Sequence, residues 1–182
     1  MTKIAVVTGN PKPKSRTHGV ATAVADAVTA ALSSGAGSSG AGPAGARADR
    51  LDIDLTEYAS RLFEWEDAEL GKLTSEVAAA GVAIFASPTY KASYTGLLKA
   101  FLDRYGSNGL AGVTAVPVMT GGWPGHLLSV EVHLRPVLVE LGATVPARGL
   151  YVTEPELADV PGAVAKWGET AIPLIARSIA TA

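Results

Sequence analysis

Two kinds of hydrophobic pattern alternate along the chain. Short apolar runs rich in β-branched residues are typical of strands in a parallel sheet. They predict strands at Ile4–Thr8, Leu51–Leu55, Val82–Ala86, Thr114–Met119 and Gly149–Thr153. Apolar residues at helical spacing between these runs predict helices at Val20–Leu32, Glu66–Ala80, Leu97–Tyr105, His126–Leu141 and Val164–Ile179. This alternation predicts an α/β fold, a three-layer, doubly wound domain with a five-stranded parallel sheet, because right-handed crossovers place helices against both sheet faces.

Local signals refine three of these elements. Leu51–Leu55 alternates apolar and acidic side chains, which favours a place nearer the edge of the sheet than its centre. Pro117 lacks a backbone N–H and predicts a local irregularity in its strand. The first helix has two candidate N-caps, Ser15 and Thr17.

The segment 33–46 contains only Ser, Gly, Ala and Pro. Such a composition offers almost nothing to bury, so we expect a flexible insertion at the surface. The whole chain has 182 residues, which predicts one domain, 1–182, that carries this insertion.

Composition excludes several classes of protein. Fifteen Lys and Arg against 17 Asp and Glu give a net charge of -2, which argues against a nucleic-acid-binding protein. The absence of cysteine excludes disulfides, thiol nucleophiles and Cys-ligated metals. The longest apolar stretch, Val77–Ala86, is far shorter than the ~18 residues of a membrane span. The first residues lack the pattern of a signal peptide, so we expect a cytoplasmic protein without a membrane partner.

Ligands of open parallel sheets bind beyond the carboxyl ends of the strands, which directs attention to the loops after the first, third and fourth strands. The first loop places Lys12, Lys14 and Arg16 within five positions, directly before a helix. A helix N-terminus with neighbouring cations favours an anion, so the loop predicts a phosphate site. A solvated basic loop is the alternative. Pro13 stands before Lys14 where a Walker A motif has Gly, and no G-x-G-x-x-G follows the first strand, so both of those phosphate motifs are disfavoured.

The loop after the third strand contains two tyrosines, Tyr90 and Tyr94, between Pro88 and Gly96. Exposed main chain beside an aromatic wall suits a planar heterocycle, and the backbone amides of Tyr90 and Lys91 are the candidate donors to its edge. An ordinary strand-to-helix turn with structural tyrosines is the alternative.

Three sequence blocks resemble the NADPH-dependent FMN reductase family of flavodoxin-like proteins. They read GNPKPKSRT, SPTYKASYTGLLKAFLD and TGGWPGHLLSVEVHLRPVL after the first, third and fourth strands, and the similarity spans Ile4 to about Val152. The first block departs from the family pattern, with Asn10 in place of Ser and Lys12 in place of Arg. The resemblance implies the strand order 2-1-3-4-5.

The resemblance also assigns site residues. It implies an FMN phosphate surrounded by Asn10, Lys12, Ser15, Arg16 and Thr17. It implies an isoalloxazine ring along Pro88, Thr89, Tyr90, Lys91 and Ser93, with Thr120, Gly121 and Gly122 at the other edge. Because cofactors carry hydride transfer, no catalytic acid or base is expected.

By the same resemblance, the expected function is an NAD(P)H-dependent FMN reductase with NADPH or NADH as hydride donor. A homodimer or homotetramer is implied, with the helix at 96–105 as a candidate contact, and a flavin-dependent monooxygenase is a candidate partner. A reductase of quinones, azo compounds or metal oxyanions with tightly bound FMN remains open. A flavodoxin-type electron carrier and a module without flavin are the further alternatives.

Other polar or aromatic features have plainer interpretations. His126 and His133 lie seven residues apart, about 10.5 Å along a helix, too far for one metal ion. Asp52 and Asp54 share one face of a strand and are better explained by a solvated edge than by a catalytic pair. No metal site is expected. Trp123 is either a shield near the flavin or a buried structural residue.

Overall fold

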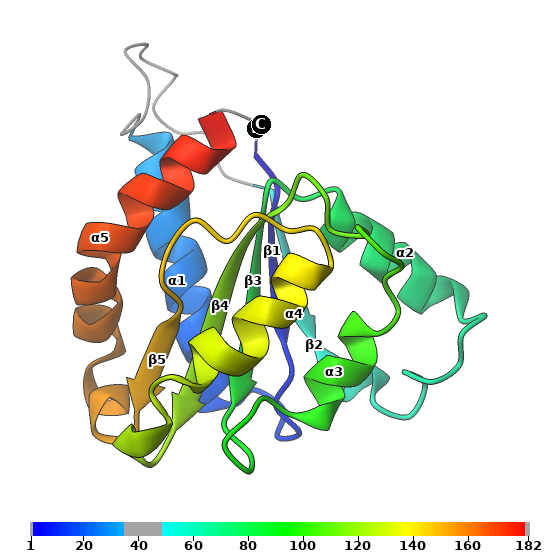
Figure 1. Ribbon diagram of the computed structural model, residues 1–182, viewed down its shortest axis with the longest axis horizontal. Helices are drawn as coiled ribbons and strands as arrows, with labels where there is room; N and C mark the ends of the chain where they lie inside the picture. The colour runs from blue at the N-terminus through cyan, green and yellow to red at the C-terminus, as the bar shows by residue number, and fades with distance from the viewer. Residues whose placement is uncertain (1, 35–48, 181–182) are drawn as a thin grey trace.

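The computed structural model describes residues 2–34 and 49–180. Its parallel sheet has the order β2-β1-β3-β4-β5 (Figure 1). The strands are β1 (Ile4–Thr8), β2 (Arg50–Asp54), β3 (Val82–Pro88), β4 (Thr114–Gly121) and β5 (Leu150–Thr153). This is the strand order of flavodoxin-like folds. The predicted three-layer, doubly wound fold and its order are therefore confirmed.

Helices cover both faces of the sheet, and each face has its own apolar core. On one face α1 (Arg16–Ser33) lies beside α5 (Val160–Ala180) (Figure 1). The other face carries α2 (Ala68–Ala78), α3 (Gly96–Leu102) and α4 (Arg135–Glu140). Alternate residues of β1 enter the two cores, with Val6 facing α1 and Val7 facing the opposite side. Among the described residues, no helix is both long and apolar enough to cross a membrane.

The predicted continuous helix at His126–Leu141 is wrong. The chain instead forms a 3-10 turn, η2 (Pro124–His126), a π-helical segment, η3 (Val130–Leu134), and only then α4. Pro136 has no N–H to donate and its ring crowds the preceding turn. Just before it, the Arg135 N–H donates to the Val130 carbonyl, five residues back. This wider π-helical turn accommodates the proline within the helical segment.

The outcome of two strand predictions depends on where each strand lies in the sheet. β2 does lie at the edge. Pro117, in contrast, causes no break in β4, where it pairs in register with Phe85 of β3. The Thr89 N–H donates to Thr120 O, and the Glu154 N–H donates to Gly121 O. The backbone N–H and C=O groups of odd-numbered residues of β4 therefore point toward β5. Because β5 pairs with β4 only from Val118 onward, Pro117 removes no donor that a neighbouring strand needs.

The Gly- and Ser-rich segment predicted at 33–46 lies outside the described residues from 35 on. Its first residues, Ser33 and Ser34, form the end and the C-cap of α1.

Candidate functional site

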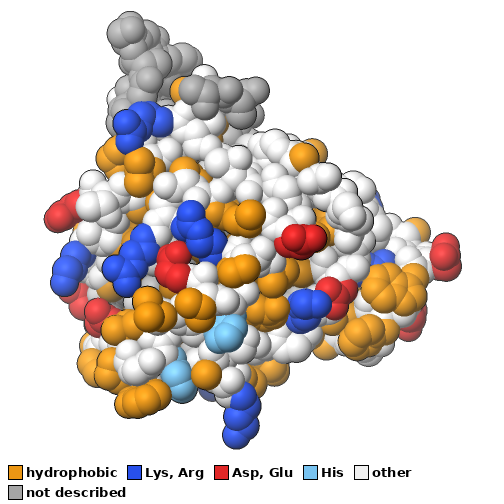
Figure 2. All heavy atoms as spheres, in the orientation of Figure 1, with side chains coloured by type: hydrophobic (Ala, Val, Ile, Leu, Met, Phe, Trp, Pro, Cys, Tyr) orange, Lys and Arg blue, Asp and Glu red, His pale blue; other side chains and the backbone are white. Residues whose placement is uncertain are grey.

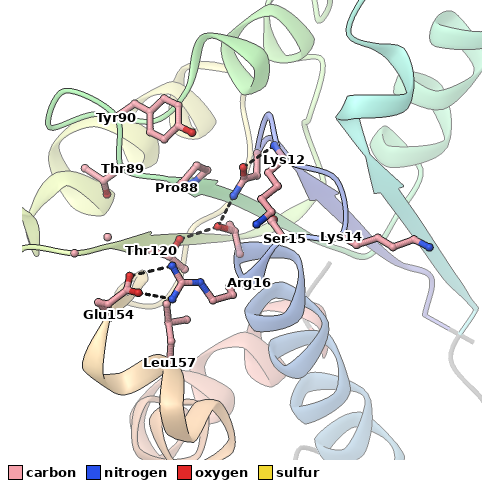
Figure 3. Close-up of a pocket in the computed structure, with 14 residues that line it drawn as sticks. Lys12, Lys14, Ser15, Arg16, Pro88, Thr89, Tyr90, Thr120, Glu154 and Leu157 are labelled. Atoms are coloured by element: carbon pink, nitrogen blue, oxygen red, sulfur yellow. Dashed lines mark hydrogen bonds and ion pairs between the residues drawn. The ribbon is translucent and has the colours of Figure 1, made fainter.

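A cavity of about 400 Å³ opens at the carboxyl ends of β1, β3 and β4 (Figure 3). Eleven of the thirteen predicted residues line it: Asn10, Lys12, Ser15, Arg16, Thr17, Pro88, Thr89, Tyr90, Thr120, Gly121 and Gly122. Lys91 and Ser93 do not. The parallel sheet brings the three predicted loops to one edge, where they form a single hollow.

The N-terminus of α1 forms one wall of this cavity. Of the two candidate N-caps, Ser15 is the N-cap, and its hydroxyl accepts a hydrogen bond of 3.2 Å from the His18 N–H. In the described part of the chain, the next two amides, those of Arg16 and Thr17, have no hydrogen-bond partner. Free amides at the positive end of a helix dipole, with Lys12 and Lys14 nearby, suit an anionic group.

A buried chain of hydrogen bonds holds the first loop in place. Asn10 Oδ1 accepts from the Lys12 N–H at 2.9 Å, and Asn10 Nδ2 donates to Thr17 Oγ1 at 3.0 Å. Thr17 Oγ1 in turn lies 2.8 Å from Thr120 Oγ1 at the end of β4. Asn10, one of the two departures from the family pattern, therefore has both ends of its amide engaged within the protein and shapes the loop.

The loop after β3 is a tight turn. The Tyr90 N–H donates to Ser93 O at 2.8 Å, and the Ser93 N–H donates to Tyr90 O at 3.1 Å. Lys91 and Ala92 both have positive φ, 51° and 63°, as the central residues of a type I′ turn require. The expectation that the Tyr90 amide faces a ligand is therefore wrong, because its N–H is hydrogen-bonded to Ser93 O within the turn. The same turn carries Lys91 and Ser93 away from the cavity, whereas the Tyr90 side chain lines it and stays 53% exposed.

Three further residues line the cavity, Lys14, Glu154 and Leu157. Glu154 follows β5 directly and makes a bidentate ion pair with Arg16, in which Nη1 meets Oε1 and Nη2 lies 3.1 Å from Oε2 (Figure 3). The hydrogen bond and the charge of Glu154 raise the pKa of Arg16 above its usual value. β5 ends at the same edge as β4, so extending the loop rule to the fifth strand would have identified Glu154.

Asp52 and Asp54 have structural roles. Asp52 pairs with Arg50, and Asp54 caps η1 (Leu55–Tyr58) while accepting from the Lys14 N–H at 3.0 Å. Trp123 is 62% exposed, so the interpretation as a buried structural residue is wrong; it packs edge-on against His126 and does not line the cavity. Across the described ranges, no group of three or more His, Cys, Asp or Glu side chains could hold a metal ion.

The fold and the cavity together define a flavodoxin-like α/β protein with free helix amides and cationic side chains at its first strand-to-helix turn. The chain belongs to the NADPH-dependent FMN reductase family, which matches residues 2–156.

Individual relatives agree with this assignment. The FMN reductase (NADPH) of Escherichia coli (strain K12) is 32% identical over 117 residues, which cover 60% of this chain and 61% of that protein. The NADH-dependent FMN reductase SfnF of Pseudomonas putida is 30% identical over 156 residues, 83% of this chain and 77% of that protein. The solved apo structure of an NADH:FMN oxidoreductase (EMOB) superposes with a TM-score of 0.71 at 28% identity, covering 92% of this chain and 88% of that one.

Proposed function

We propose that this protein is an NAD(P)H-dependent FMN reductase that binds FMN in the cavity at the carboxyl ends of β1, β3 and β4. The observation that carries the proposal is the anion cradle, in which two unpartnered amides at the N-terminus of α1 meet the cations of the first loop. A phosphate ester matches this donor set, because helix N-termini and charge-assisted hydrogen bonds both favour negative charge.

The residues of the cradle have two proposed roles, binding the phosphate and positioning the loop. Lys12, Arg16 and the hydroxyls of Ser15 and Thr17 are the proposed ligands, and Asn10 positions the loop that carries them. Ser15 and Thr17 are 7% and 2% exposed, so their groups are fixed before the ligand arrives. Lys12 is a point charge without the bidentate fork of an arginine, which favours weaker phosphate binding than the family pattern gives.

The rest of the cavity suits a flat ring. Pro88, Thr89 and Tyr90 border one side, and Thr120, Gly121 and Gly122 border the other. Nothing lies within 4 Å of a Cβ built on Gly122, so the chain there leaves open space for a close approach. When bound, FMN supplies the ring that accepts hydride from NADPH or NADH. We propose that the protein's own side chains position the two nucleotides and provide no catalytic acid or base.

The names of the relatives include both NADPH- and NADH-dependent enzymes. We therefore propose both nucleotides as hydride donors. We also propose that a flavin-dependent monooxygenase uses the reduced flavin and that the protein acts in the cytoplasm.

A homodimer or homotetramer is part of the proposal, but the apolar side chains of the helix at 96–105 are mostly buried, so another contact is proposed. Figure 2 shows hydrophobic side chains on the face that carries α4. The segment before and within α4 exposes Leu127, Leu128, Val132 and Val139, by 41% to 60%. Several large exposed apolar side chains on one short segment are typical of an interaction surface.

The test uses protein stripped of flavin and follows the loss of nicotinamide absorbance in air. We expect turnover of NADPH and NADH to require added FMN and to saturate with free flavin. Tight FMN binding, with turnover only on adding a quinone, azo compound or metal oxyanion, would favour the alternative reductase. Absence of flavin binding would contradict the proposal.

A further inference from the structure

Arg16 is the one cation of the cavity lining that has a carboxylate partner within the described residues. Lys12 and Lys14 line the same hollow, and neither forms an ion pair there. The bidentate contact with Glu154 occupies both Nη groups of Arg16, which are the fork that arginine offers to a phosphate. A carboxylate of the protein and a phosphate in the cradle therefore compete for the same donors.

The backbone around Glu154 is held by hydrogen bonds, whereas the side chains of the ion pair are exposed to solvent. The Glu154 N–H donates to Gly121 O at 3.0 Å, and Glu156 holds the preceding residue by accepting from the N–H and hydroxyl of Thr153 at 2.8 and 2.6 Å. The side chains of Arg16 and Glu154 are 67% and 54% exposed. Water screens such a pair, so the contact is weak enough to open when a ligand arrives.

Glu154 also stays beside the cradle after the pair opens, because its backbone N–H is bonded to Gly121 O. It is the single acidic residue of the lining, among the described residues, and its ion-pair partner there is Arg16. A bound phosphate dianion would meet a carboxylate at the edge of its site, and like charges at short range oppose binding.

We propose that Glu154 is a specificity-determining residue that competes with the phosphate of FMN for Arg16 and keeps the flavin exchangeable. The inference rests on the proposed function and deepens it, because it assigns weak, reversible binding of phosphate-bearing flavin to one side chain. It concerns the phosphate alone, so riboflavin, which lacks that group, is indifferent to Glu154.

The experiment titrates FMN and riboflavin into flavin-free protein and measures the quenching of flavin fluorescence. Glu154→Gln keeps the size of the side chain and removes its charge. We expect it to tighten FMN binding about fivefold at low salt, with less gain at high salt and no change for riboflavin. Glu169→Gln is the matched control: Glu169 is exposed on α5, lies outside the cavity lining and changes the net charge equally.

A double-mutant cycle separates competition from simple repulsion. In an Arg16→Ala background, Glu154→Gln should gain less for FMN than in the wild type, because the donors in dispute are gone. Equal or weaker FMN binding by Glu154→Gln, in protein that still binds FMN, would overturn this inference alone. A gain shared with riboflavin or with Glu169→Gln would also overturn it. Loss of FMN binding by wild type and variants alike would overturn the proposed function together with it.

Discussion

Thr17 Oγ1 and Thr120 Oγ1 lie 2.8 Å apart although 103 positions separate them in the chain. The contact joins the first turn of α1 to the end of β4, and Asn10 extends it into the basic loop. Two of the elements that form the cavity, α1 and β4, are thus joined by buried hydroxyls. The shape of the anion cradle depends on this connection.

Thr17→Val tests that connection. The valine would leave the Thr120 hydroxyl and the Asn10 amide without their shared partner in a buried place, which should lower the free energy of unfolding by about 1–3 kcal/mol. Denaturant titration measures this loss. Thr170→Val, at an exposed position of α5, is the control and should change stability little. A Thr17 variant as stable as the control would contradict the structural role.

Gly9→Ala tests how closely the first loop approaches α3. A Cβ at Gly9 would lie 2.4 Å from Leu98 Cβ and 2.9 Å from Leu98 Cα, so helix and loop would have to separate. We expect a loss of about 2–3 kcal/mol in the free energy of unfolding. Gly122→Ala is the matched control, since nothing lies within 4 Å of its added Cβ. Equal stability of the two variants would show that the close approach is wrong.

Asp67 predicts a specific dependence of stability on pH. Its carboxylate caps α2 through the Leu70 N–H at 3.0 Å and accepts from Arg61 Nη1 at 2.6 Å. The hydrogen bond from Leu70 and the Arg61 charge lower the pKa of Asp67. A lowered carboxyl pKa stabilises the folded state above the unfolded pKa of about 3.9, and this stabilisation disappears as the pH falls through the folded pKa.

Asp67→Asn should therefore be less stable than wild type at neutral pH, because asparagine can still cap the helix but loses the charge. Unfolding followed by circular dichroism from pH 7 downward should show the difference shrinking below about pH 4. A difference that grows on acidification would have the wrong sign.

The exposed apolar segment before α4 predicts the oligomer contact. Light scattering should give a mass of two or four chains of 18.5 kDa for the wild type. Leu128→Glu combined with Val132→Glu should shift the protein toward the monomer, because both side chains are more than half exposed in the single chain. Phe63→Glu, at a 72% exposed position beyond η1, should leave the mass unchanged. A monomeric wild type would refute the assembly.

The sequence was sufficient for the fold because each buried strand is a continuous apolar run that a helical segment follows. The rule that parallel strands bring their carboxyl ends to one edge identified the three loops of the cavity, and the family resemblance named most of the residues that line it. Glu154 was missed because a single surface glutamate carries no signal unless the loop after β5 is considered. The turn at Lys91 and Ala92 lacks the Gly or Asn that normally indicates positive φ. Helical periodicity likewise continues through Pro136, so the π-helical segment before it went unpredicted.

The central claim is that the cradle at the start of α1 binds the phosphate of FMN. Parallel titrations of flavin-free protein with FMN and riboflavin test it most directly, in wild type and in Lys12→Ala combined with Arg16→Ala. We predict that the double variant weakens FMN binding about tenfold or more while riboflavin binding stays nearly unchanged, because only FMN carries the phosphate. Lys72→Ala, on α2, should affect neither flavin. Equal losses for both flavins in the double variant would contradict the account.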